Sequence, residues 1–124
     1  MTQIVFIAAG GAIGALLRFW MSQGIYTLLG RGFPYGTLSV NVLGSLVMGI
    51  LYVFLYERMN MSPEWRAALV IGLLGAFTTF STFSIETLNL LEASEHLKAF
   101  VNILLSISLC LVACWFGIIG ARQL

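Results

Sequence analysis

The sequence predicts an all-α membrane protein with four transmembrane helices, built as a single domain over residues 1–124. Hydrophobic residues make up 60% of the chain and charged residues only 9%, whereas a soluble domain carries about 25% charged residues. The charges also leave long uncharged runs, at 32–56, 67–85 and 99–121, and the first 30 residues contain one charge, Arg18. A helix needs about 20 mostly apolar residues to cross a bilayer. A membrane β-barrel would instead need short segments of alternating polarity, which this chain lacks.

Turn residues and charges mark the ends of the four helices. The first is followed by a segment rich in glycine and proline at 30–36, and the second by a polar segment at 57–64. Within that segment Ser62, Pro63 and Glu64 suit the start of a helix. A third polar segment covers 86–98. The predicted helices are 3–29, 37–56, 64–86 and 97–121.

We expect the third helix to be broken near its middle. In the segment 75–84, Phe77, Phe80 and Phe83 recur every three residues with hydroxyl side chains between them. Threonines and a glycine weaken a regular helix, and a break would free backbone carbonyls and amides, which a membrane tolerates only inside protein or beside a polar cavity. Such carbonyls could coordinate a cation, and phenylalanine ring edges could approach an anion. The alternative is ordinary packing, with each hydroxyl bonded to its own helix.

Two polar residues within the first two predicted helices each allow two interpretations. Arg18 is the only charge well inside a span. It either extends to the membrane interface or faces an aqueous vestibule and attracts anions. Asn41 shares the second helix with Thr37 and Ser39. Its amide either joins two helices or donates to an anion.

The fourth helix carries one polar stripe. Asn102, Ser106 and Cys110 follow one another at intervals of four residues, so they share a helix face and could line a track. Cys110 and Cys114 are also four residues apart on one helix, a spacing that does not suit a disulfide. We interpret both as small packing residues.

The distribution of basic residues allows an unusual assembly. Four spans place both termini on one side with Arg58, Arg66 and Arg122, and leave Arg31 and Lys98 on the other, with Arg18 nearer to that side. Basic residues normally set orientation by their excess on one side, and here the tally is three against three. Either the lipid environment decides, or the chain inserts both ways and pairs as an antiparallel dual-topology homodimer.

Several functional classes are excluded. The formal net charge of +1 provides no basic face for nucleic acid. The chain has no nucleophile–base pair, metal-binding cluster or phosphate-binding loop, so we expect no enzyme. It also has no carboxylate in the middle of a predicted span. Because a proton-coupled pump needs a titratable group at depth, this absence favours passive conduction.

Three segments together resemble a known family. They are GGAIGALLRF at 10–19, YGTLSVNVLGS at 35–45 and GLLGAFTTFSTFS at 72–84, the last followed by Glu86. In order and spacing they resemble the CrcB family, also called Fluc, of bacterial fluoride channels. The resemblance covers nearly the whole chain and is weakest in the fourth helix.

The resemblance implies a passive channel in the bacterial inner membrane that exports fluoride and gives fluoride resistance. It also implies antiparallel homodimers with two pores and a central structural sodium ion. The residues it assigns to the fluoride pathway are Phe80, Phe83, Asn41, Ser81 and Thr82. We add Thr37 as a neighbour of these residues, and Ser106 from the polar stripe of the fourth helix. The resemblance assigns Arg18 to a vestibule, and the backbone carbonyls of Gly75 and Thr78 to sodium.

Two rival functions remain. A small multidrug-type proton-coupled exporter also has four helices and dual topology, but it needs a carboxylate deep in its first helix, and residues 1–30 contain none. A structural or assembly subunit would show packing residues only, and the hydroxyl-rich aromatic segment of the third helix argues against it.

Overall fold

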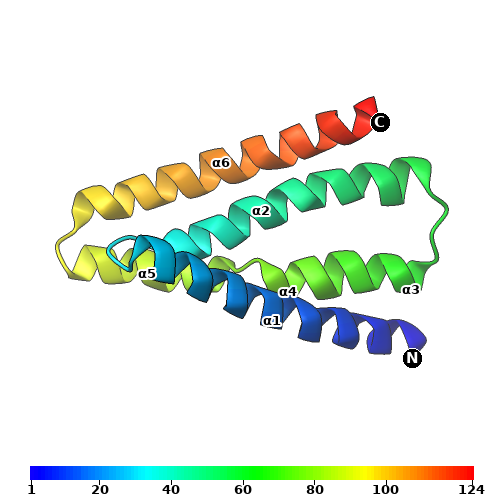
Figure 1. Cartoon of the computed structure of the whole chain (residues 1–124), viewed down its shortest axis with the longest axis horizontal. Coiled ribbons are helices and arrows are strands. Elements are labelled where there is room, and N and C mark those ends of the chain that lie inside the picture. The colour runs from blue at the N-terminus through cyan, green and yellow to red at the C-terminus, as the bar shows by residue number, and fades with distance from the viewer.

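The structure, a computed structural model describing residues 1–124, is entirely helical (Figure 1). The first span is α1 (Thr2–Leu29), and the second is α2 (Tyr35–Tyr52) continued by the wider π turns of η1 (Val53–Arg58). The fourth span is α6 (His96–Gln123). The third consists of the pieces α3 (Pro63–Arg66), η2 (Ala67–Leu74), α4 (Gly75–Phe77) and α5 (Phe80–Glu92). All four spans are long and apolar enough to cross a membrane, which confirms the predicted fold class.

The third span is longer than predicted. It ends at Glu92 rather than residue 86, so most of the polar segment at 86–98 is helical. Glu86 lies inside α5, where its Oε2 accepts a hydrogen bond of 3.0 Å from the Tyr26 hydroxyl. His96, which the sequence placed in a loop, begins α6. The link between α5 and α6 is therefore only residues 93–95. The polar residues of 86–98 include a side chain bonded to another helix, Glu86, and the first residue of a helix, His96.

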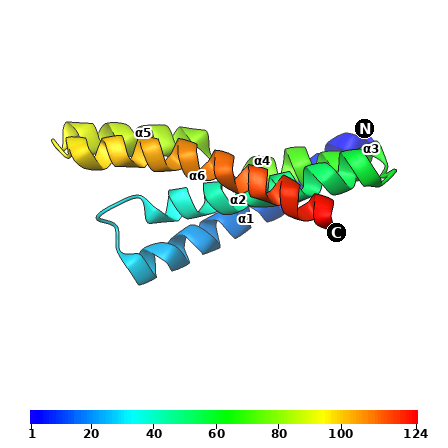
Figure 2. The same cartoon turned by 90° about the horizontal axis from the view of Figure 1, so that it is seen from above.

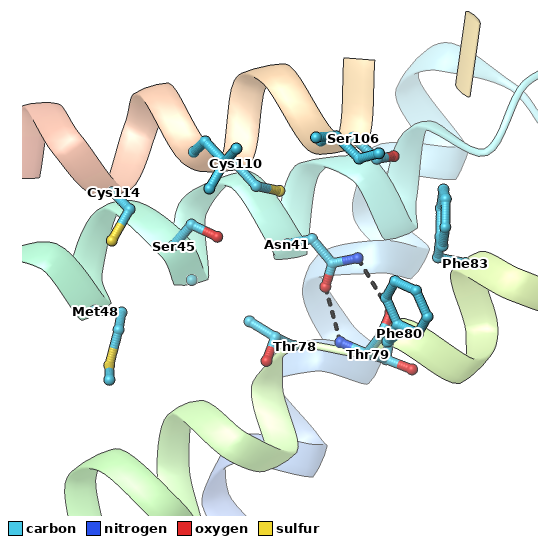
Figure 3. A pocket seen from close by; sticks show the side chains of 13 residues that line it. Asn41, Ser45, Met48, Thr78, Thr79, Phe80, Phe83, Ser106, Cys110 and Cys114 are labelled. Carbon is cyan, nitrogen blue, oxygen red and sulfur yellow. Dashed lines mark hydrogen bonds between the residues drawn. The ribbon is translucent and has the colours of Figure 1, made fainter. Parts of the chain in front are cut away.

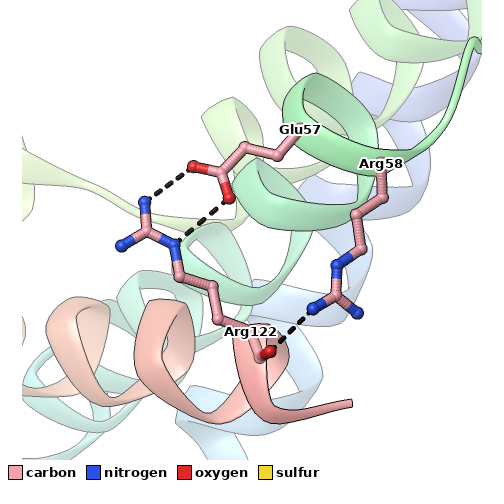
Figure 4. A network of polar contacts seen from close by, with 3 residues as sticks. All are labelled: Glu57, Arg58 and Arg122. Carbon is pink, nitrogen blue, oxygen red and sulfur yellow. Dashed lines mark hydrogen bonds and ion pairs between the residues drawn. The ribbon is translucent and has the colours of Figure 1, made fainter.

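Both termini lie at the same end of the bundle, together with the link between η1 and α3 (Figure 1). At this end Arg122 forms a two-point ion pair with Glu57, 2.7 Å at its shortest, and Arg58 donates to the Arg122 carbonyl (Figure 4). These contacts join the end of α6 to η1. Because they are solvent-exposed, they add little to stability, and the helices depend on close packing instead.

Glycines allow that close packing. A Cβ on Gly10 or Gly14 of α1 would collide with the backbone of η2, and one on Gly72 of η2 would collide with the backbone of α1. Gly49 of α2 and Gly117 of α6 meet in the same way. Small residues let membrane helices approach until their backbones touch, and this contact drives their association. The bundle is thus built from two close pairs, α1 with η2 and α2 with α6.

Gly14→Ala is expected to destabilise the protein by about 1–3 kcal/mol, because the new methyl meets backbone of η2 that cannot yield. Thermal unfolding in detergent measures the effect. Gly24→Ala is the matched control, since nothing lies within 4 Å of a Cβ on this other glycine of α1. Equal melting temperatures for the two variants would contradict the packing described here.

Candidate functional site

The third span is interrupted at Thr78 and Thr79. Both residues have extended backbone, with φ/ψ of −90°/158° and −152°/113°. α4 ends just before them and α5 begins just after, so the predicted break near the middle of this helix is confirmed. Thr79 also caps α5, because its Oγ1 accepts a hydrogen bond of 3.2 Å from the Thr82 amide.

Asn41 of α2 satisfies the interrupted backbone. The Thr79 amide donates to Asn41 Oδ1 over 2.8 Å, and Asn41 Nδ2 donates to the Thr79 carbonyl over 3.1 Å (Figure 3). Thr79 is only 8% exposed, so both groups would otherwise be buried without a partner, at a cost of about 1–3 kcal/mol each. These atoms of Asn41 therefore join two helices, and one hydrogen on Nδ2 remains available.

An open groove of about 460 Å³ lies beside the break. Its walls come from α2, the two extended residues, α5 and α6 (Figure 3). The lining residues are Asn41, Gly44, Ser45, Met48, Thr78, Thr79, Phe80, Phe83, Ser106, Ile107, Cys110, Leu111 and Cys114. The groove thus brings together five of the predicted site residues and contains no ionisable group other than two thiols.

The two predicted pathway phenylalanines lie next to each other in this groove. The ring centroids of Phe80 and Phe83 are 5.3 Å apart at an interplanar angle of 43°. Phe80 is 78% exposed, so nothing in the single chain covers it. Its ring therefore lies at the open side of the groove.

A second cavity, of about 230 Å³, lies on the other side of the break. It is lined by Ala15, Arg18, Phe19, Ser22, Thr37, Val40, Thr79 and Thr82. Arg18 is half-buried here and makes no ion pair, since the only ion pair of the protein is that of Glu57 with Arg122. Thr79 lines both this Arg18 cavity and the groove, so both spaces border the break.

Some predicted site residues lie elsewhere. Ser81 is exposed and lines neither space, although its hydroxyl is 3.4 Å from that of Thr79. Gly75 is also exposed and lies outside both. The predicted polar stripe of α6 is divided, because Asn102 is buried behind the groove while Ser106 and Cys110 line it. Cys114, interpreted as a packing residue, lines the groove as well.

Comparison with known proteins identifies the family. The family described as "CrcB-like protein, Camphor Resistance (CrcB)" matches residues 5–118. The chain belongs to the CrcB family. A protein named fluoride-specific ion channel FluC from Geobacter sulfurreducens is 50% identical over 124 residues, the full length of both chains. A relative of the same name from Coxiella burnetii is 47% identical and covers 98% of this chain and 99% of its own.

A third relative differs in length. The fluoride-specific ion channel FluC of Methylococcus capsulatus is 57% identical over 118 residues, which are 95% of this chain but 52% of that protein. The chain thus spans about half the length of this relative and nearly the whole of the other two.

The segments that resemble the CrcB family converge on the break. Arg18 comes from the first segment, Asn41 from the second, and Thr78 and Thr79 from the third. In the structure Asn41 bonds Thr79, and Arg18 lines a cavity with Thr79. The three stretches are therefore held together by one structural feature, although up to some 60 residues separate them in the chain.

One cluster of polar contacts in this CrcB chain has no counterpart among the features that the sequence predicts. The Tyr26 hydroxyl donates to Glu86 and lies 3.5 Å from the Thr37 hydroxyl, while the Arg31 guanidinium stacks 4.5 Å from the centre of the Tyr26 ring. Tyr26, Arg31 and Glu86 also line a third cavity, of about 220 Å³. No local pattern signals a contact between Tyr26 and a carboxylate 60 residues further along the chain.

Replacing Asn41 by leucine is expected to lower stability by about 2–6 kcal/mol, because the Thr79 amide and carbonyl each lose their partner. Thermal unfolding in detergent measures the change. Ser45→Ala is the control, since Ser45 lines the same groove from the same helix without bonding the break. If the Asn41→Leu and Ser45→Ala variants have the same melting temperature, Asn41 does not hold the break.

Proposed function

We propose that this CrcB-family chain is a passive, fluoride-selective channel that exports fluoride across the bacterial inner membrane and so gives fluoride resistance. The observation that carries the proposal is the groove at the break, which combines an amide, hydroxyls and two phenylalanines and lacks any carboxylate. The names of its relatives, which are fluoride-specific ion channels, point in the same direction.

The groove suits a small, strongly hydrated anion. Moving such an ion out of water costs many kcal/mol unless other donors replace the water. The remaining Nδ2 hydrogen of Asn41, the hydroxyls of Ser45 and Ser106, and the ring edges of Phe80 and Phe83 are the donors present. No lysine or arginine lines the groove. An ion bound only by neutral donors can leave again, as conduction requires.

Arg18 and its neighbours would serve as the entrance. Arg18 is the single charge in its cavity, where Thr37 and Thr82 add hydroxyls, so it raises the local anion concentration without a competing carboxylate. The Ser81 hydroxyl lies 3.4 Å from that of Thr79 at the same break. Neither cavity at the break contains a carboxylate. The first span contains none either, whereas the proton-coupled exporter needs one there.

An antiparallel homodimer would complete the pathway. The groove is open and Phe80 is 78% exposed, so a single four-helix domain of residues 1–124 leaves one wall missing. A second copy can supply that wall through a two-fold axis. The equal distribution of basic residues supports insertion in both directions, and a two-fold axis in the membrane plane then gives two equivalent pores.

Gly75 and Thr78 fit the sodium site that the family resemblance implies. The Thr79 amide turns to Asn41, so the Gly75 carbonyl loses the partner that a continuous helix would give it. Gly75 is also exposed, on the surface where a second copy would dock. Hard cations bind carbonyl oxygens, and two carbonyls from each copy would give four ligands. A bound sodium ion would supply a fixed positive charge at the dimer axis.

Purified protein in liposomes tests the function. We expect fluoride efflux, followed with a fluoride electrode, and far slower chloride efflux under the same gradient. Phe80→Ile and Phe83→Ile should each slow fluoride efflux at least tenfold, about 1.4 kcal/mol of barrier, while the dimer still elutes intact. The absence of fluoride efflux, or equal chloride efflux, would refute the function. Normal efflux from both variants would refute the role of the phenylalanines.

The chain's two cysteines test whether the groove is the pathway. Cys110 and Cys114 are its only thiols and both line the groove. A bulky methanethiosulfonate reagent that attaches there should fill the groove and stop most fluoride efflux. The Cys110→Ala/Cys114→Ala double variant is the control, and its efflux should not respond to the reagent. Unchanged efflux from protein that carries the label, shown by its mass, would place the pathway elsewhere.

A further inference from the structure

A buried chain of hydrogen bonds runs behind the groove and joins its α5 wall to its α6 wall. Asn102 of α6 is 2% exposed and lines none of the three cavities. Its Nδ2 donates to Thr87 Oγ1 over 2.9 Å, and Thr87 Oγ1 donates to the Phe83 carbonyl over 2.7 Å. At the other end of the amide, Ser106 Oγ donates to Asn102 Oδ1 over 3.5 Å. The chain thus begins and ends at groove residues, Phe83 and Ser106.

The direction of these bonds fixes the orientation of the amide. Thr87 has one hydroxyl proton, which the Phe83 carbonyl receives in the short 2.7 Å bond. Thr87 can therefore only accept from Asn102, and Nδ2 must face it. Oδ1 of Asn102 then faces Ser106. A carbonyl acceptor is in this way held permanently beside a hydroxyl of the groove.

Ser106 has a single proton for two acceptors. The proton points either to Asn102 Oδ1 or into the groove. The 3.5 Å separation from Oδ1 is long for an O–H···O bond, which is usually near 2.7–2.8 Å. A strong acceptor in the groove can therefore take the proton, whereas a weak one cannot. Fluoride is a stronger acceptor than chloride because a smaller ion brings the same charge closer to the proton.

We propose that Asn102 is a specificity-determining positioning residue, whose Oδ1 competes with the anion in the groove for the Ser106 proton. Fluoride wins this competition and gains Ser106 as a donor, and chloride does not. The proposal rests on the proposed function of the groove as a fluoride pathway. Asn102 itself does not touch an ion in the groove, since it is 2% exposed and does not line the groove, and it acts only through Ser106.

Asn102→Leu and Thr87→Val test the proposal in liposomes in which fluoride and chloride efflux are both measured. The first removes the competing acceptor. Thr87→Val frees the Asn102 amide to turn its Nδ2 toward Ser106. The Ser106 proton then has no acceptor on Asn102 and is available to the groove. Both are expected to raise the chloride-to-fluoride efflux ratio by about two- to tenfold, the factor that one ordinary hydrogen bond contributes. Thr87→Ser keeps the hydroxyl and should retain the wild-type ratio.

Repeating the test in Ser106→Ala protein separates the proposed role of Asn102 from a merely structural one. In Ser106→Ala protein there is no proton to compete for, so adding Asn102→Leu should leave the ratio unchanged. A ratio shifted equally in both backgrounds, or not shifted in the wild-type background, would overturn the proposal. If Asn102→Leu does not assemble, Thr87→Val with Ser106→Ala decides in the same way. Wild-type fluoride efflux, measured alongside, tests the proposed function separately.

Discussion

The two hydrogen bonds between Asn41 and the backbone of Thr79 are the constraint on which the rest of the site depends. A single side chain replaces the partners that a continuous helix would have given to one amide and one carbonyl. Without it the Thr79 amide has its nearest natural acceptor at the Gly75 carbonyl, four residues earlier, and the helix would close. An interruption inside an apolar bundle persists only where its polar groups are paired.

The rest of the site follows from this interruption. The Gly75 carbonyl loses its helical partner, and the Thr79 hydroxyl caps a new helix, α5. From Phe80 onward α5 runs alongside α6 rather than α1, as Figure 2 shows. That change of course places Phe80 and Phe83 opposite Ser106 and Cys110 across one groove. It also places Thr82 in the Arg18 cavity, beside Thr37 of α2. One local departure from helical geometry thus creates polar surface on both sides of the third span. It does so in a chain with few charged residues.

The sequence predicted the four spans and the break because both depend on local composition. Uncharged runs have the length of a bilayer, and the threonines after Gly75 weaken a helix where it does end. The sequence did not predict which hydroxyl groups bond their own helix and which do not. Thr78, Ser84 and Thr87 bond carbonyls of their own helices, as the packing interpretation expected, whereas Thr79 and Thr82 bond each other at the cap. Nor could it predict that Asn102 is buried behind the groove or that Glu86 meets Tyr26, because these contacts depend on how α5 packs after the break.

Fluoride efflux through the Asn41→Leu variant measures whether the break that Asn41 holds is what lets the chain conduct. Efflux is measured per unit mass of reconstituted protein in liposomes and compared with Gly24→Ala, which lies in open space on α1 and borders neither of the two cavities at the break. Asn41→Leu is expected to lose nearly all efflux, while Gly24→Ala retains most of it. Folded Asn41→Leu protein that conducts fluoride at the wild-type rate would show that conduction does not depend on the break held by Asn41.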